Sequence, residues 1–109
     1  MIKYKKPSLI NFSIYPEYNG TLIPFYTDVH FPKSFILKRF FILYGKSKYF
    51  RADHAHIKCS QIIIPLRGII SITIKGKNYL RNFELSEKKK KGITVPPYNW
   101  IKINFQNNE

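Results

Sequence analysis

The segment IISITIKGKNYLRNFEL, residues 69–85, contains the pattern that decides the fold class. Isoleucines at alternate positions from Ile70 to Ile74 are separated by polar residues. This period of two is typical of a strand with one buried face. Lys75–Asn78 follows and contains Gly and Asn, which adopt the positive φ angles of a tight hairpin turn. Tyr79–Leu85 then predicts the returning strand, so the whole segment predicts an antiparallel β-hairpin.

Short apolar segments separated by turn residues continue on both sides of this hairpin, as in sandwiches and barrels. Aromatic residues make up 17% of the chain, which favours strands, and no segment has a convincing helical period. Further strands are expected at Leu9–Ile14, Thr21–Phe25, Phe35–Tyr44, Cys59–Leu66, Gly92–Val95 and Trp100–Phe105, with a turn at Glu17–Gly20 and a loop at Gly45–Tyr49. Pro65 has no N–H and is expected at a bulge or an edge. The prediction is an all-β fold, and 109 residues suit one domain spanning residues 1–109.

The chain has one cysteine, Cys59, so neither an intrachain disulfide nor a cysteine-based zinc site is possible. This composition fits a reduced, cytoplasmic setting. The basic segment Met1–Lys6 is followed by polar residues and Pro16, which is unlike a signal peptide. The apolar runs are too short to span a bilayer. We therefore expect a cytoplasmic protein with no membrane partner.

The formal net charge of +13 has two interpretations. It can serve an anionic partner, such as a nucleic acid or a phosphorylated small molecule. It can also reflect a biased composition, because Lys, Ile, Asn, Tyr and Phe are enriched together. Lysines are spread along the chain, and the one run, Lys88–Lys91, falls in a predicted loop. We therefore expect no nucleic-acid partner and favour a phosphate-bearing ligand.

The segment RADHAHIK, residues 51–58, contains two of the three histidines. In an extended backbone His54 and His56 point to the same side. Arg51 and Lys58 flank the pair, so an anion can bind nearby and the imidazoles tend to stay neutral, as a general base requires.

Three interpretations of the pair are open. A metal site needs further ligands, yet His30 is the only other histidine and carboxylates are few. The histidines can be structural polar residues of a strand. They can also be acid–base or substrate-positioning groups. We favour this third interpretation and predict neither a metal nor another cofactor.

The segment RADHAHIKCSQ, Arg51–Gln61, resembles the signature of the nucleotide-sugar 3,4-ketoisomerases, which are WxcM-like cupins acting on dTDP-4-keto-6-deoxyglucose. Other segments resemble this family in order and spacing: INFSIYPEYNGTL (Ile10–Leu22), LKRFFILY (Leu37–Tyr44), LRGIISITI (Leu66–Ile74) and GITVPPYNW (Gly92–Trp100). The resemblance extends from Ile10 to about Phe105.

The resemblance implies a small jelly-roll cupin that forms a homodimer and binds a dTDP-linked sugar. It implies an isomerase that moves a keto group between C4 and C3 of the sugar, in the synthesis of deoxyamino sugars for surface glycans such as lipopolysaccharide. By position, His54 would be the base and His56 its partner. The implied substrate-binding residues are Arg51, Lys58, Gln61, Tyr18, Tyr98 and Trp100.

The chain also departs from the family pattern. Asn19 stands where the family commonly has Arg, Phe41 where it often has an active-site Tyr, and Ile101 where it often has a polar residue. Family members usually continue through one more strand, so we expect the barrel to lack the last strand of the family. The alternative function is a non-catalytic, degenerate cupin that binds a nucleotide sugar.

Overall fold

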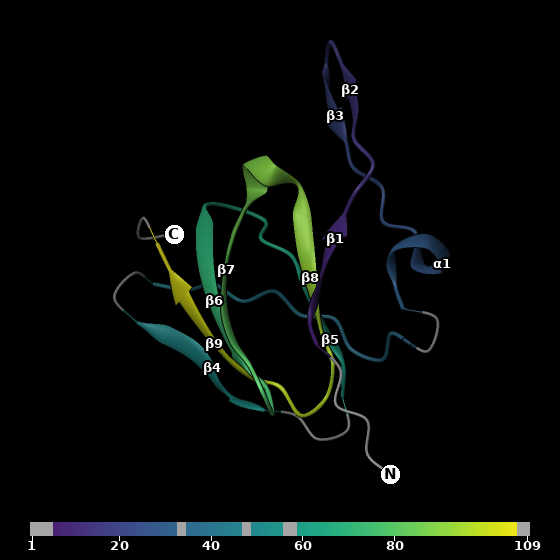
Figure 1. Ribbon diagram of the computed structural model, residues 1–109. Coiled ribbons are helices and arrows are strands. Elements are labelled where there is room, and N and C mark those ends of the chain that lie inside the picture. Colours follow the sequence, from purple (N-terminus) through teal and green to yellow (C-terminus); the bar gives the residue numbers. More distant parts are fainter. Residues whose placement is uncertain (1–5, 33–34, 47–48, 56–58, 107–109) are drawn as a thin grey trace.

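The predicted hairpin lies at the centre of the larger sheet. A computed structural model of the chain describes residues 6–32, 35–46, 49–55 and 59–106 (Figure 1). Strands β6 (Ile69–Lys75) and β7 (Leu80–Ser86) pair antiparallel, with Ile72 opposite Phe83. Along β6 buried and partly exposed residues alternate, because every second side chain faces the core. The hairpin prediction is therefore confirmed.

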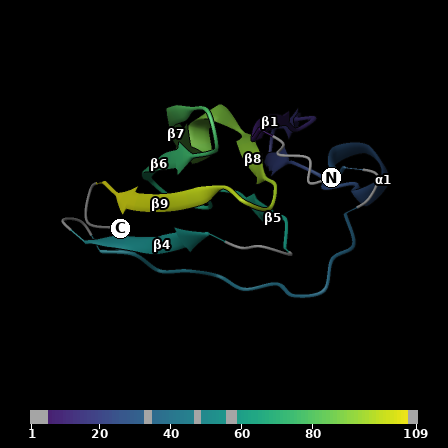
Figure 2. The same cartoon turned by 60° about the horizontal axis from the view of Figure 1, so that its bottom comes forward.

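Two sheets form the body of the molecule. The larger has the order β4-β9-β6-β7, and the smaller has the order β1-β8-β5. Figures 1 and 2 show the two sheets facing each other as the layers of a sandwich. The remaining strands of the body are β1 (Ser8–Asn11), β4 (Phe50–Ala55), β5 (Gln61–Ile63), β8 (Lys91–Val95) and β9 (Trp100–Phe105).

The core lies between the two sheets. Ile72 and Ile74 of β6 have no exposed surface, and they pack in one cluster with Ile93 of β8. The rest of the buried cluster is Ile70, Leu85, Val95, Ile101 and Ile103. Burial of apolar surface from both layers is the largest stabilising term for a fold of this kind.

Three small elements complete the described chain. Strands β2 (Tyr15–Glu17) and β3 (Gly20–Leu22) form a separate two-stranded hairpin, with the turn predicted at Glu17–Gly20. A one-turn helix, α1, spans Thr27–His30, and a 3₁₀ turn, η1, spans Glu87–Lys89. The all-β prediction is confirmed, with these single turns as the helical content of the described residues.

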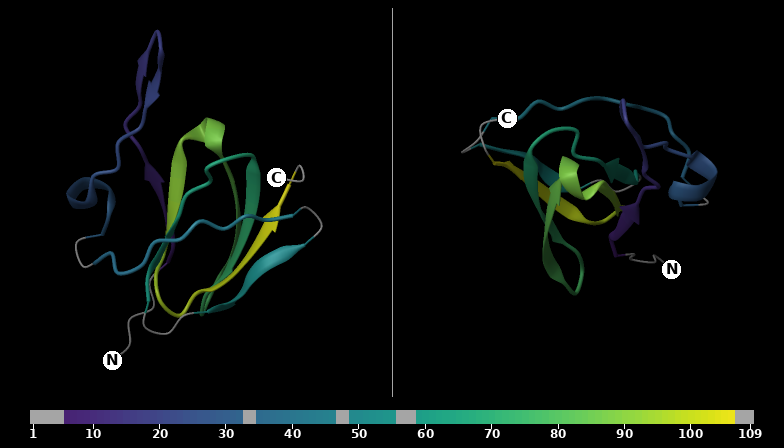
Figure 3. Two further views of the ribbon diagram at one scale, coloured as in Figure 1. Left: turned by 180° about the vertical axis from the view of Figure 1, so that it is seen from behind. Right: turned by 90° about the horizontal axis from the view of Figure 1, so that it is seen from above.

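The predicted strand Phe35–Tyr44 is wrong. Residues 35–46 are all described, and they form no strand. They run extended across one side of the sandwich from α1 toward β4 (Figure 3). Strand propensity depends on neighbours, and this segment has no ladder partner in its own chain. The predicted strand Cys59–Leu66 is also shorter, Gln61–Ile63, and Pro65 lies outside it because it cannot donate to a ladder.

We predict that Ile72→Ala lowers the free energy of unfolding by about 2–5 kcal/mol, because it leaves a cavity between the two sheets. Urea unfolding followed by circular dichroism measures this change. Leu80→Ala is the matched control, since Leu80 lies on the same hairpin and is 63% exposed. Equal losses in the two variants would contradict this position of the core.

Candidate active site

A β-bulge in β4 sets the position of His54. Arg51 pairs with Ile103 of β9 and His54 pairs with Ile101, so β4 takes one residue more than β9 over this interval. A strand has a period of two, and an unbroken ladder would give positions 51 and 54 opposite parity. The bulge gives both residues partners of the same parity on β9. Bulges often re-aim side chains beside active sites.

Strands β4 and β5 lie at the edges of the two sheets. Gln61 begins β5, is half-buried and pairs with Val95 of β8. Arg51 is exposed on β4. The predicted residues Arg51, His54 and Gln61 therefore border the same open side of the sandwich, from opposite layers (Figure 2).

Three of the predicted side chains are not available for this geometry. His56 and Lys58 lie outside the described residues. The backbone of His54 is described, but its side chain is not. The catalytic roles of His54 and His56 and the role of Lys58 in substrate binding stay predictions.

The turn between β8 and β9 carries two further predicted residues. Tyr98 has a φ of 66°, in the left-handed region that a non-glycine residue rarely adopts. Trp100 is half-buried and begins β9, where it pairs with Ala55 at the end of β4. This pairing brings the turn next to the end of the His54 strand.

Asn99 holds this turn in place. Its side chain is 4% exposed, and Nδ2 donates to the carbonyl oxygens of Pro96 at 3.0 Å and Pro97 at 3.3 Å. The Tyr79 hydroxyl donates to Asn99 Oδ1. Buried polar atoms need such partners, and these bonds hold the left-handed conformation of Tyr98. Burial raises the pKa of the Tyr79 phenol above its ordinary value, which keeps it a donor.

The sequence analysis missed Tyr79 and Asn99. Asn99 carries a local signal, because Asn directly after a Pro-Pro pair favours a turn in which its side chain binds nearby backbone. Tyr79 carries no such signal. Its partner lies 20 residues away along the chain, and only the pairing of β6 with β7 and β9 brings the two together.

Tyr18 is not brought to the other predicted residues. It lies at the turn of the β2–β3 hairpin with a relative exposure of 101%. Figures 1 and 3 show this hairpin projecting from the body of the molecule. The role of Tyr18 in substrate binding stays a prediction.

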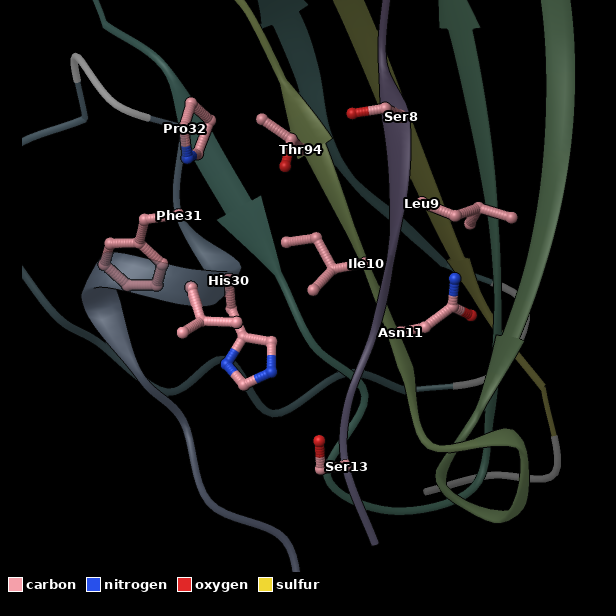
Figure 4. A pocket seen from close by; sticks show the side chains of 10 residues that line it. Ser8, Leu9, Ile10, Asn11, Ser13, His30, Phe31, Pro32 and Thr94 are labelled. Carbon is pink, nitrogen blue, oxygen red and sulfur yellow. The ribbon is translucent and has the colours of Figure 1, made fainter.

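His30 lies in a different region, in α1. Its Nδ1 accepts a hydrogen bond from the Tyr26 N–H at 2.9 Å, and its ring packs against Phe12 at 5.1 Å. It borders an open hollow of about 520 Å³ between α1, β1 and Thr94 of β8 (Figure 4). None of the predicted site residues lines this hollow. Among the described side chains, no three of His, Cys, Asp and Glu gather as metal ligands.

The family comparison decides the identity of the fold. The family model described as FdtA: WxcM-like, C-terminal, matches residues 5–109. The chain belongs to this family. The family predicted from the segment Arg51–Gln61 is therefore confirmed.

Solved structures of the same fold agree. The sugar 3,4-ketoisomerase QdtA from Thermoanaerobacterium thermosaccharolyticum, in complex with TDP, is 25% identical, with a TM-score of 0.80 over 93% of this chain and 72% of that chain. The TDP-fucose-3,4-ketoisomerase WlaRA from Campylobacter jejuni is 25% identical, with a TM-score of 0.75 over 95% and 76%. The TDP-quinovose 3,4-ketoisomerase WlaRB from the same organism shares the fold, at 21% identity, a TM-score of 0.83 and coverages of 95% and 79%.

The predicted cupin-type fold is confirmed by these likenesses. A comparison with curated proteins gives no match. In the part of the chain that the structure describes, no helix is long and apolar enough to cross a membrane.

We predict that Tyr79→Phe lowers the free energy of unfolding by about 1–3 kcal/mol, because it leaves the buried Asn99 oxygen without a donor. Urea unfolding at neutral pH measures the loss. Tyr15→Phe, which removes the same hydroxyl from an exposed strand of the β2–β3 hairpin, is the control and should change stability little. A neutral Tyr79→Phe would mean that the hydroxyl does not hold the turn.

The same pair of proteins also predicts a pH dependence. The pKa of Tyr79 is higher in the folded chain than its ordinary value of about 10. The stability due to the neutral phenol is therefore fully present below about pH 10 and is lost as the pH rises through the folded pKa. We expect wild type to lose more stability than Tyr79→Phe between about pH 8 and about pH 11. Parallel pH profiles of the two proteins would contradict this.

Proposed function

We propose that this chain is a 3,4-ketoisomerase of a TDP-linked 4-keto-6-deoxy sugar, with dTDP-4-keto-6-deoxyglucose as the substrate. The observation that carries the proposal is the family match over residues 5–109. Relatives at 25% identity are a sugar 3,4-ketoisomerase in complex with TDP and a TDP-fucose-3,4-ketoisomerase, which supports both the reaction and the nucleotide.

The reaction needs one proton to move between neighbouring carbons. A base removes the proton from C3, next to the C4 ketone, and the electrons of the C3–H bond form an enediolate. A proton is then returned to C4, so the C3 hydroxyl becomes the ketone and the C4 ketone becomes the hydroxyl. No net oxidation occurs, and no redox partner is needed. His54 is our candidate for the base and His56 for its partner.

The surroundings of β4 suit an anionic intermediate. Arg51 is always protonated and lies on the same strand as His54, where it can bind the diphosphate or stabilise the enediolate oxygen. Gln61 at the opposite edge and Tyr98 and Trp100 at the β8–β9 turn complete the proposed binding residues. The positive net charge of +13 favours encounter with a doubly charged nucleotide sugar.

We further propose that the protein acts in the cytoplasm as a homodimer, in the synthesis of deoxyamino sugars for surface glycans. Nucleotide sugars of this kind are soluble intermediates, which fits that location. The family resemblance motivates the dimer, and two copies would also cover apolar surface that one copy leaves exposed.

Asn19 and Phe41 support a second candidate function, a nucleotide-sugar-binding protein without turnover. Both positions lack the polar group that the family commonly has there. Loss of a transition-state hydrogen bond costs about 10²–10³ in rate. Binding through the nucleotide would survive such losses.

Proton NMR of dTDP-4-keto-6-deoxyglucose with the protein in D2O separates the two candidates. We expect a new 3-keto sugar with deuterium at C4, because the returned proton comes from solvent. The configuration at C4 identifies the product. An unchanged sugar spectrum, together with stabilisation of the fold by dTDP in a thermal melt, would reject the isomerase and support the binding protein.

We predict that His54→Asn lowers kcat by about 10²–10⁴-fold, as expected when a general base is removed. His30→Asn is the matched control, because it makes the same substitution in α1, away from the bulge. Initial rates from the NMR assay, with circular dichroism to verify folding, measure the effect. Unchanged turnover in a folded His54→Asn protein would rule out this residue as the base.

A further inference from the structure

The β2–β3 hairpin stands apart from the body of the described chain. All six of its strand residues are exposed, and its only substantial contacts within that part of the chain are between its own two strands. A two-stranded hairpin alone is marginally stable in water. This one also exposes apolar side chains, with Tyr15 at 52% and Leu22 at 65%. The hairpin therefore needs a surface to pack on.

A surface of matching character lies on residues 35–46, which we call the 35–46 segment. Phe40, Phe41 and Tyr44 are 76%, 62% and 86% exposed. The segment belongs to no strand, although its sequence strongly favours one. It is fixed at one end, where Gly45 lies against the ring of Phe105 so closely that a Cβ would clash. It leads directly into β4, the strand of Arg51 and His54.

The two surfaces are complementary in charge. The only charged residue of the hairpin, Tyr15–Leu22, is the acid Glu17. The 35–46 segment carries Lys38, Arg39 and Lys46 and no acid. In a chain of net charge +13, an acidic projection and a basic apolar segment attract each other, whereas most other pairs of surfaces repel.

The exposed area also fits an interface. Taking about 200 Å² for a whole aromatic side chain, the five aromatic residues of the two surfaces expose roughly 750 Å² in one copy. This is close to the area of about 800 Å² that each partner contributes to a standard protein interface. The five residues are Tyr15, Tyr18, Phe40, Phe41 and Tyr44.

We propose that the β2–β3 hairpin of one copy lies on the 35–46 segment of a second copy and supplies Tyr18 to that copy's active site. The proposal rests on the proposed function for what the site does. A two-fold axis makes the exchange reciprocal, so each copy donates one hairpin and accepts one. The site is then built from His54 of one copy and Tyr18 of the other. The Tyr18 hydroxyl donates a hydrogen bond to a sugar oxygen there.

Mixing two impaired variants tests the shared site. Tyr18→Ala and His54→Asn should each lower turnover at least tenfold. After unfolding and refolding together in equal amounts, they should recover about one quarter of wild-type turnover, because half of the dimers are mixed and each mixed dimer has one intact site. Variants refolded separately and assayed at once are the control. Recovery that does not exceed this control, or full activity of Tyr18→Ala alone, would overturn the proposal.

A second experiment reads the interface without any activity. The chain has a single tryptophan, Trp100, and a single cysteine, Cys59. Tyr18→Cys with Cys59→Ser and Trp100→Phe is labelled with an energy acceptor and refolded with excess wild type. Excitation of tryptophan in the wild-type copy should then give acceptor emission. The control carries the label at Asn78→Cys in the β6–β7 turn and should give much less emission.

These two experiments separate the two proposals. If wild type shows no isomerase turnover but energy transfer from Trp100 occurs, the shared site stands and the reaction assignment fails. If wild type is active while transfer and recovery are both absent, the shared site fails alone. Light scattering adds a further readout: Tyr44→Asp on the 35–46 segment should give a monomer, and Leu80→Asp, at an exposed position of β7, should remain a dimer. A dimeric Tyr44→Asp would count against the interface.

Discussion

The packing of β6 between its two neighbours is the constraint on which the other elements depend. Ile72 and Ile74 are completely buried, and β6 pairs with β7 on one side and β9 on the other. The register of β9 on β6 fixes where Trp100 begins, and β9 in turn fixes β4. The bulge between Arg51 and His54 is measured against this ladder. The backbone at the proposed base is therefore positioned by the core, two strands away.

The β8–β9 turn shows how local strain is kept at the edge of the site. Tyr98 adopts a left-handed φ, which costs free energy for a residue with a side chain. Asn99 is buried, and its three hydrogen bonds hold the turn closed from within. Tyr79, which completes this network, comes from the end of the central hairpin. The same hairpin that builds the core thus also holds the turn that leads to Trp100.

Two parts of the chain have the composition of strands or interfaces but no partner within one copy. The β2–β3 hairpin is exposed throughout, and the 35–46 segment is apolar, basic and outside both sheets. A ladder of hydrogen bonds needs a second strand, and apolar side chains need a covering surface. A second copy can supply both, which links the assembly of the protein to the completeness of its site.

The sequence by itself determined the all-β class, the central hairpin and the family, because a period of two, turn residues and the segment Arg51–Gln61 are all local signals. It also located the positions of Gln61 and Trp100 on strands. It did not determine that residues 35–46 would remain unpaired, that a bulge would align Arg51 with His54, or that Tyr79 would bind Asn99. Only the tertiary structure decided these, because each depends on which distant segment becomes the neighbour, and hydrogen-bond pairing between strands is not encoded in either strand alone.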